Sequence, residues 1–392
     1  MEQAVLVDGV RTPFGRLGGE LAELQGYELA ALAIQMLLQR VDPTHVGEVI
    51  LGVGLLSSGT MVPARRALHE AHLSLEIPSI AVDRACCSGM TAIGMAADEI
   101  ALGRHHLVVA GGMESMSQTP LMLRSPRTGS KVGDQVVEDI LLMRSPLADA
   151  PIARYTGEVA LTYGVDREAQ DRWALRSHER YFQAADQGKL SDEIRVHPVG
   201  RSGIPMELDE PPRRDTSMEK LSLLRPVYGS PTVTPGNAPG LNDGAAATTV
   251  VSETYARTNG LEPLAHIVDH VSMAGEPTSA VYLPAHAIQR LLQRNGIALK
   301  ELIALEINEA FAAVPAVSLR VLADGDRSIL DTLEERTNVN GGAVAIGHPV
   351  GASGARITYS AALEARRRGG GYAVAAICGG FGQTDAILLK VG

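Results

Sequence analysis

Two cysteines, a histidine and an asparagine lie in segments whose composition suits covalent acyl transfer. Cys86 is in VDRACCSGM, between a predicted strand and a predicted helix of small residues that begins near Ser88. A thiol at a helix N-terminus faces unpaired N–H groups and the positive end of the helix dipole, which favours the thiolate. An unpaired cysteine is also a common small buried side chain, so position alone leaves nucleophile and packing residue open for Cys86. The neighbouring Cys87 is predicted to be a packing residue.

His348 lies in the glycine-rich segment NVNGGAVAIGHPVGASGARI, again just before a predicted helix. The glycines and Pro349 hold the backbone in a fixed, open path, so the imidazole could serve as an acid or a base. A structural histidine is the alternative. A phosphate-binding loop is the weaker interpretation, because the closing Gly-Lys-Ser/Thr of that motif is absent.

Two further polar residues follow predicted strands near the C-terminus. Cys378 is in AICGGFGQ, at a glycine-rich turn, and Asn308 is in EINEAFA, where a strand ends. A buried structural cysteine and a turn or cap amide are the alternatives. Ligands of α/β sheets gather at the carboxyl ends of strands. We therefore predict that these groups converge with Cys86 and His348 for acyl transfer with a separate acid or base.

Other polar groups give weaker signals. His266 and His270 in HIVDHV resemble a zinc pair, but they lie in a predicted strand with no third ligand nearby, so we predict no metal site. A basic group interleaved with acidic residues could hold a phosphate or form a solvated mixed surface. This group comprises Arg213, Arg214, Lys220 and Arg225.

The elements that must position these residues occur twice along the chain. Each half contains strand, helix, strand, helix and strand in the same order, followed by a similar closing strand. The predicted elements are 3–9, 27–40, 45–52, 88–103, 105–112 and 245–252 in the first half, and 264–273, 285–296, 302–310, 353–367, 372–380 and 385–392 in the second. The alternation predicts α/β layers, and the duplication predicts two similar halves packed together.

The stretch from about 113 to 242 has no counterpart in the second half, so we predict an insertion before the first closing strand. It contains one clear helix signal, from Asp166 to Gly188. Long insertions usually carry binding or assembly surfaces. The predicted division is an N-terminal half (1–117 and 243–262), an inserted loop domain (118–242) and a C-terminal half (263–392).

Composition restricts the class of protein. The 392 residues carry a formal net charge of −10, which argues against a nucleic-acid or anionic-membrane partner. No apolar run reaches the roughly 18–20 residues of a membrane span, and the first residues lack a signal-peptide pattern. Three cysteines are too few for a disulfide framework, so we predict a reducing, cytoplasmic location.

Several segments, in order along nearly the whole chain, resemble the thiolase family. The resemblance implies a five-layered α/β/α/β/α fold of two duplicated halves with an inserted loop domain. It implies reversible Claisen condensation of an acyl-CoA with acetyl-CoA, and thiolysis of 3-ketoacyl-CoA in reverse. No metal or redox cofactor is expected, since the coenzyme A thioesters are substrates. The matching blocks are RTPFGRLGG (11–19), DRACCSGM (83–90), AGGMESMS (110–117), GNAPGLNDGAAA (236–247), NEAFA (308–312), NGGAVAIGHPVGASGAR (340–356) and CGGFGQ (378–383).

By motif position, the resemblance implies a role for each of the polar residues. Cys86 would take up the acyl group, and His348 would activate it and polarise a thioester oxygen. Cys378 would remove or return the α-proton, and Asn308 would hold a water in one oxyanion hole. The N–H groups of Gly380 and Cys86 would form the other. Family members are commonly homotetramers or homodimers, which is also the expectation here.

Departures from the family pattern fall around the coenzyme and the acyl group. Pro239 stands where the family usually has Ser, and Pro235 where Ala is common. Phe381 and Thr384 each replace a usual Gly, and residues 153–160 read ARYTGEVA instead of Met-Gly-x-Thr-Ala-Glu-Asn-Val-Ala. Coenzyme A contacts are expected at four residues. These are Arg213, Pro239, Ala310 and Phe311.

The predicted activity is acetyl-CoA C-acetyltransferase, in fatty acid metabolism, with a longer-chain 3-ketoacyl-CoA thiolase as the alternative. A non-catalytic acyl-CoA-binding protein is less favoured, because Cys86, His348 and Cys378 are all present. A ketoacyl synthase would share the fold and a cysteine nucleophile. Such enzymes pair that cysteine with two His, or His and Asn, so the second Cys favours a thiolase.

Overall fold

The computed structural model describes residues 2–55, 60–123, 129 and 132–392. Its main sheet has ten strands in the order β12-β13-β14-β11-β1-β10-β5-β3-β4, with β2 paired to β10. The strands are β1 (Ala4–Arg11), β2 (Gly15–Arg16), β3 (Glu48–Gly52), β4 (Ser79–Val82), β5 (Leu107–Ser115), β10 (Asn242–Ser252), β11 (Ala265–Ala274), β12 (Leu302–Ile307), β13 (Gly371–Gly379) and β14 (Gln383–Val391).

The sheet consists of two parts with the same strand arrangement. β1-β10-β5-β3 and β11-β14-β13-β12 each contain two antiparallel pairs followed by one parallel pair. The same irregularity recurs, because the register shifts between Leu6 and Asp8 in β1 and between Ile267 and Asp269 in β11. The duplication predicted from the sequence is therefore confirmed in the strand order and in its register.

Two central helices, α3 (Ser88–Ala101) and α12 (Val350–Arg367), lie between the two parts of the sheet. Each contacts strands of both, since α3 packs on β5 and β14, and α12 packs on β13 and β5. Alternate residues of β5 face opposite sides. Val108 belongs to the core cluster of the central helices, whereas Val109 belongs to the cluster around α1.

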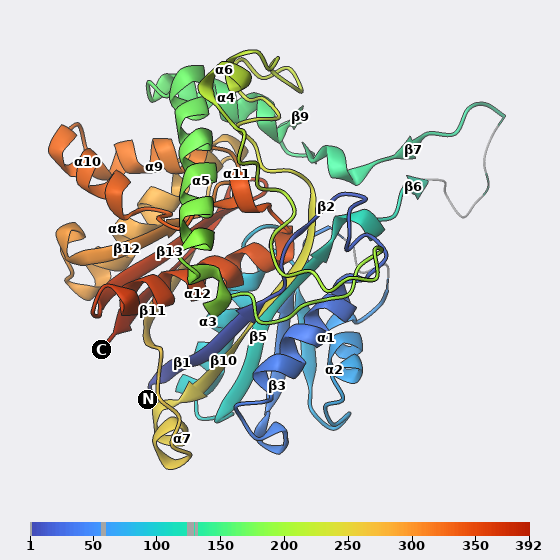
Figure 1. Cartoon of the computed structure of the whole chain (residues 1–392), viewed down its shortest axis with the longest axis vertical. Coiled ribbons are helices and arrows are strands. Elements are labelled where there is room, and N and C mark those ends of the chain that lie inside the picture. The colour runs from blue at the N-terminus through green and yellow to red at the C-terminus, as the bar shows by residue number, and fades with distance from the viewer. Residues whose placement is uncertain (1, 56–59, 124–128, 130–131) are drawn as a thin grey trace.

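Further helices cover the outer faces of the sheet. Helices α1 (Gly26–Leu37) and α2 (Pro63–Glu70) cover the first half, and α8 (Leu283–Asn295), α9 (Ala313–Ala323) and α10 (Arg327–Arg336) cover the second (Figure 1). The five-layered α/β/α/β/α fold is confirmed. Two short helices complete these halves, α7 (Glu253–Thr258) and α11 (Ala343–Ile346).

Small residues allow the two central helices to approach closely at their N-termini. A Cβ added at Gly89 would lie 2.6 Å from the carbonyl oxygen of Gly351, and one added at Gly354 would lie 2.6 Å from the backbone nitrogen of Met90. Any side chain at these positions would force the helices apart, because real Cβ atoms do not approach that closely. The close approach brings together the two segments that precede the helices.

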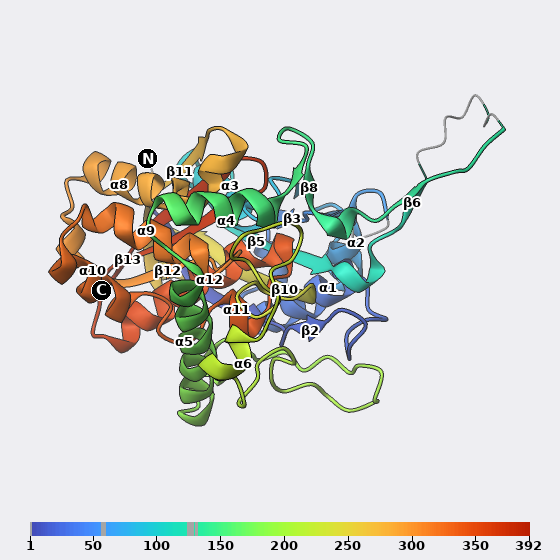
Figure 2. The ribbon, with the colours of Figure 1, turned by 90° about the horizontal axis from the view of Figure 1, so that it is seen from above.

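The segment between β5 and β10 contains the inserted elements. The β6–β7 ribbon extends away from the body, as Figure 1 and the second view in Figure 2 show. These elements are β6 (Met122–Leu123), β7 (Val137–Glu138), β8 (Arg144–Ser145), β9 (Ala150–Pro151), α4 (Ile152–Thr162), α5 (Arg167–Asp186) and α6 (Met218–Ser222). The α5 helix matches the predicted helix signal, and its N-cap Asp166 accepts a hydrogen bond from the Ala169 N–H. Within the described ranges, no helix combines the length and apolarity needed to cross a bilayer.

Candidate active site

Cys86 and His348 meet where the two central helices begin. The Cys86 sulfur lies 3.2 Å from His348 Nε2. Cys86 is half-buried, and His348 is 5% exposed. The His348 backbone N–H donates to Asn242 Oδ1 at 2.9 Å, and its Nδ1 lies 2.7 Å from Ser353 Oγ. The imidazole is thus held at its backbone and at one ring nitrogen, with the other directed at the thiol.

The hydroxyl of Ser353 determines which ring nitrogen carries the proton. Ser353 Oγ donates its single proton to the Pro349 carbonyl at 2.9 Å, so it accepts from His348 Nδ1–H. Nε2 is then the acceptor that faces Cys86. Burial, and after it the charge of Arg356, lowers the pKa of His348 to about 3. The imidazole is therefore a neutral base at neutral pH.

The surroundings of Cys86 correct one prediction. Burial raises the pKa of the Cys86 thiol, and charges on Cys378 and Glu114 raise it further. The backbone N–H groups of Cys86 and Gly380 act in the opposite direction, because they hydrogen-bond the sulfur. The prediction that the helix start favours a resting thiolate is wrong here, since loss of hydration outweighs those donors. The resting pair is a thiol beside a neutral imidazole.

A cavity of about 410 Å³ opens onto this pair. Its walls combine strand ends of the second half with residues of the inserted segment, and they are mainly apolar. Eight of the nine predicted site residues line this one space. They are Cys86, His348, Cys378, Gly380, Arg213, Pro239, Ala310 and Phe311.

Cys378 is near the end of β13 and is 5% exposed. Burial raises the pKa of its thiol to about 12. The next residue, Gly379, packs against the nucleophile segment, since an added Cβ would lie 2.8 Å from Cys87 Sγ and 3.0 Å from the Arg84 carbonyl oxygen. Cys87 is fully buried, as its predicted packing role requires. Phe381, where the family pattern has Gly, adopts a φ of 68° in the left-handed region that favours glycine.

Asn308 directly follows β12 and is 1% exposed. Its backbone N–H donates to the Ala376 carbonyl at 2.9 Å. Across the described residues, neither Asn308 Nδ2 nor Oδ1 has a hydrogen-bond partner. Asn308 is not among the residues that line the cavity, although Ala310 and Phe311 are. A buried unpaired amide costs about 1–3 kcal/mol, so it is a group suited to holding a water or ligand.

Family models match almost the whole chain. The thiolase N-terminal domain matches residues 4–254, and the thiolase C-terminal domain matches residues 261–391. The chain belongs to the thiolase family. It is therefore an acyltransferase, and the resemblance of its motifs to that family is confirmed.

Known relatives and solved structures are similar to this chain over nearly its full length. A probable acetyl-CoA acetyltransferase of Mycobacterium leprae (strain TN) is 38% identical over 399 residues, covering 100% of both chains. The crystal structure of the Bacillus anthracis acetyl-CoA acetyltransferase superposes with a TM-score of 0.94 at 36% identity, covering 100% of this chain and 99% of that one. The human mitochondrial 3-ketoacyl-CoA thiolase in complex with CoA gives 0.93 at 36% identity, covering 100% and 98%.

Glu114 connects the two halves of this thiolase and was not found by sequence reasoning. Its Oε2 accepts from the backbone N–H groups of Gly54 and Gly351, both at 2.9 Å, and its Oε1 accepts from Leu55 at 3.3 Å. Gly351 is in the first turn of α12. A fully buried carboxylate of the first half thus fixes the start of the helix that follows His348. These three donors are backbone N–H groups, so side-chain patterns in the sequence give no signal for them.

Glu309 has a similar role for the inserted segment. Its carboxylate accepts from Trp173 Nε1 and Ser177 Oγ of α5, both at 2.8 Å. It also accepts from Asn338 Nδ2 and the Val344 N–H, both at 3.0 Å. This buried carboxylate therefore holds α5 and the segment leading to His348 against the end of β12.

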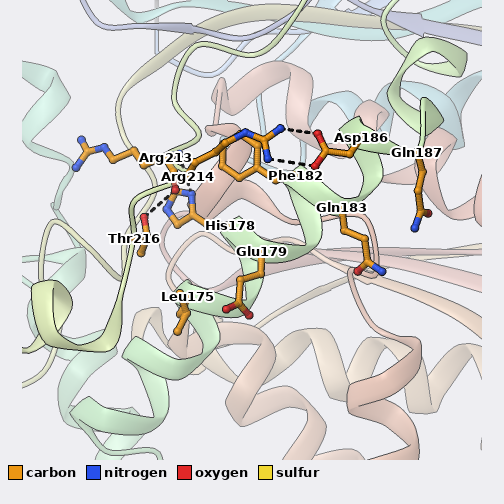
Figure 3. A pocket seen from close by; sticks show the side chains of 10 residues that line it. All are labelled: Leu175, His178, Glu179, Phe182, Gln183, Asp186, Gln187, Arg213, Arg214 and Thr216. Atoms are coloured by element: carbon orange, nitrogen blue, oxygen red, sulfur yellow. Dashed lines mark hydrogen bonds and ion pairs between the residues drawn. The ribbon is translucent and has the colours of Figure 1, made fainter.

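One member of the predicted basic group, Arg213, lies beside both the active-site cavity and a neighbouring one. A second cavity, of about 500 Å³, lies along α5 and shares Arg213 with the first (Figure 3). There Arg214 forms a two-point ion pair with Asp186, and the Arg213 backbone N–H donates to His178 Nδ1 at 3.2 Å. Arg213 is thus the member of the group that lines the active-site cavity.

The two histidines considered as zinc ligands contact different carboxylates. His266 Nε2 lies 3.2 Å from Glu253 on α7, and His270 Nε2 lies 3.0 Å from Asp98 on α3. Both are in β11, as the predicted strand requires. They form two separate contacts and not one ligand set.

Proposed function

We propose that this thiolase is an acetyl-CoA C-acetyltransferase, which condenses two molecules of acetyl-CoA and cleaves acetoacetyl-CoA in the reverse direction. The observation that carries the proposal is the 3.2 Å contact between Cys86 and His348, in the cavity that also contains Cys378. The acetyl-CoA acetyltransferases among its relatives support the choice of substrate.

In the first half-reaction, His348 Nε2 takes the Cys86 proton as the sulfur attacks the thioester carbonyl. The N–H groups of Cys86 and Gly380 stabilise the oxyanion, and such preorganised donors commonly contribute several kcal/mol. Cys378 gives its proton to the departing coenzyme A sulfur. The products are acetyl-Cys86, a Cys378 thiolate and an imidazolium at His348.

In the second half-reaction, the Cys378 thiolate removes the α-proton of a second acetyl-CoA. The imidazolium of His348, with a water held by Asn308, stabilises the enolate oxygen. The enolate carbon attacks acetyl-Cys86, which forms the carbon–carbon bond and releases the Cys86 sulfur to take the imidazolium proton. Acyl transfer between thiols is nearly balanced in energy, so both directions are open.

Coenzyme A is proposed to bind in the same cavity, in contact with Arg213, Pro239, Ala310 and Phe311. The human relative whose structure was solved with CoA supports the binding of coenzyme A. Each chemical step is a proton or acyl transfer, so we propose that the enzyme needs no metal or redox cofactor. We further propose a homotetramer or homodimer in the cytoplasm, acting in fatty acid metabolism, as the family resemblance and the three unpaired cysteines suggest.

A longer-chain 3-ketoacyl-CoA thiolase is the second candidate, favoured by the apolar walls of the cavity and by the human 3-ketoacyl-CoA thiolase relative. Thiolysis of acetoacetyl-CoA, measured beside 3-ketoacyl-CoAs of increasing chain length, separates the two. The proposal expects the highest kcat/KM with acetoacetyl-CoA. A kcat/KM that increases with chain length would contradict it and favour the second candidate.

A further inference from the structure

Tyr155 is a buried hydroxyl of the active-site cavity that the mechanism above does not use. It is in the first turn of α4 and lines the cavity together with Cys86 and Cys378. Its side chain is 4% exposed, and in the described parts of the chain its Oη has no hydrogen-bond partner. Burial, then charges on Cys378 and Cys86, raises the pKa of Tyr155. The phenol therefore keeps its proton and stays a donor in the cavity that Cys86 and Cys378 also line.

The helix that carries Tyr155 is held close to the cavity. At Gly157, an added Cβ would lie 2.2 Å from Ser230 Oγ, so α4 packs tightly on the segment before β10. Aligned on the shared Val-Ala of the family pattern, Tyr155 stands where that pattern has Thr. The exchange places a longer hydroxyl-bearing side chain in the cavity that contains the reacting sulfurs.

Other donors near the reaction centre already have a group to bind. His348 Nε2 faces Cys86, and the N–H groups of Cys86 and Gly380 face the Cys86 sulfur. In the proposed mechanism, Cys378 takes the α-proton of a second acetyl-CoA in this same cavity, which leaves a negative charge on the substrate oxygen. Buried polar groups are normally paired, and an unpaired one calls for an explanation. A negative charge that forms on the substrate only during turnover would explain the unpaired phenol.

We propose that Tyr155 is a further catalytic residue, whose hydroxyl donates a hydrogen bond to the negative charge that develops on the oxygen of the second acetyl-CoA as Cys378 removes its α-proton. This role rests on the proposed function. In the step concerned, the α-C–H bond of the acetyl thioester breaks and the S–H bond of Cys378 forms. The electron pair passes to the enolate, while Tyr155 keeps its own proton throughout.

Two half-reactions separate this role from simple packing. Acetylation of Cys86 by acetyl-CoA is followed by mass spectrometry, and α-proton removal is followed by uptake of solvent deuterium into the methyl group of acetyl-CoA. Tyr155→Phe should acetylate at the rate of the unmodified enzyme but exchange deuterium about 10- to 100-fold more slowly, as expected for loss of one hydrogen bond to a charged group. Tyr163→Phe, which follows the last residue of the same helix and does not line the cavity, should match the unmodified enzyme in both.

Each result has a defined consequence. Deuterium exchange at the normal rate in Tyr155→Phe would overturn the role. An equal loss of acetylation and exchange, or a loss of thermal stability that Tyr163→Phe does not show, would assign Tyr155 to packing and also overturn it. If the unmodified enzyme neither acetylates nor exchanges, the proposed function fails first, which distinguishes that failure from a failure of the Tyr155 role alone.

Discussion

The two halves of this thiolase have one scaffold but different groups at matched positions. In the first half, Asp8 follows the bulge and pairs with Thr249 of β10, which pairs in turn with Val109 of β5. In the second half, Asp269 pairs with Leu388 of β14, which pairs in turn with Val374 of β13. Val109 of β5 therefore corresponds to Val374 of β13. Counting forward equally from these two residues matches Met113 with Cys378 and Glu114 with Gly379. In the parallel pairs, the same comparison matches Gly52 with Asn308.

The difference separates framework from chemistry. At the strand ends of the first half, Met113 is fully buried, and an added Cβ at Gly52 would lie 2.4 Å from the Ser88 carbonyl carbon. Gly52 packs against the start of α3, and Met113 belongs to the core cluster around α1. The matched ends of the second half carry Cys378 and Asn308 instead. Both halves contribute the residue that precedes a central helix, so the proposed chemistry is shared at the helix starts and one-sided at the strand ends.

The helix starts should show the largest effect. Cys86→Ala removes the only proposed site of covalent acylation, so we expect both thiolysis and condensation to fall by about 10⁴-fold or more. Steady-state assays of acetoacetyl-CoA thiolysis and acetyl-CoA condensation measure the two directions. Substantial activity in either direction, with the fold intact, would exclude Cys86 as the nucleophile.

The strand ends should differ between the halves. Cys378→Ala is expected to accept an acetyl group on Cys86 but to condense about 10²–10⁴-fold more slowly, because it removes a proton-transfer group. Met113→Leu, the matched change in the first half, conserves volume and should cost less than about 1.5 kcal/mol of stability without a comparable loss of rate. Mass spectrometry of the acetylated enzyme and steady-state rates of condensation are measured for both variants. Equal losses of condensation in the two would remove the proposed asymmetry.

The connection between the halves can be weakened at Glu114. Glu114→Gln replaces an acceptor oxygen by an N–H₂ group facing backbone donors, so the free energy of unfolding should fall by about 1–3 kcal/mol. It also removes a negative charge near Cys86, so the pKa of that thiol should fall. Denaturant unfolding and the pH dependence of Cys86 alkylation test the two effects.

Glu309→Gln is the matched control for that variant, because Glu309 is also a buried carboxylate bound by backbone and side-chain donors. Its charge is not among the causes of the Cys86 pKa shift. It should therefore lower stability without changing the pH dependence of Cys86 alkylation. An equal change in alkylation in both variants would show that the effect comes from loosened packing and not from charge.

The smallest effect is expected in the segment that leads into β10. Pro239 lacks an N–H and fixes φ, so the segment offers few polar contacts to a coenzyme. Pro239→Ser should change the apparent affinity for acyl-CoA by no more than about tenfold and leave the acetylation rate unchanged. Binding titration with acetyl-CoA and single-turnover acetylation measure these. A change in which acyl chain is accepted would mean that this segment selects the substrate.

The repeat in the sequence was enough to predict two similar α/β halves and the meeting of Cys86 with His348, and the family resemblance added the five-layered fold. Hydrophobic periodicity located the duplicated strands and helices. Register was harder, because repeated Gly-Gly pairs suggest a match of Gly111 with Gly379, whereas the bulges match Glu114 with Gly379. Residue types alone therefore do not fix which strand positions correspond, because that depends on the pairing between strands.

Groups that act through burial or backbone contacts escaped the sequence analysis. Glu114 was missed because it binds N–H groups that any residue carries. Tyr155 lay within a segment noted only for its departure from the family pattern. The protonation state of Cys86 was mispredicted because the helix-start argument omits desolvation. The catalytic and coenzyme-binding roles of the predicted site residues, and the boundaries of the inserted segment at 118–242, remain predictions.

The central claim is that Cys86 carries the acyl group between the two half-reactions. The most direct measurement is peptide mass spectrometry of Cys378→Ala enzyme after brief exposure to acetyl-CoA, because slow condensation should preserve the intermediate. The account predicts one acetyl group, located on the peptide that contains Cys86, and its release as acetyl-CoA when coenzyme A is added. An acetyl group located on another residue, or a fully folded enzyme that turns over acetoacetyl-CoA without any acetylated peptide, would contradict it.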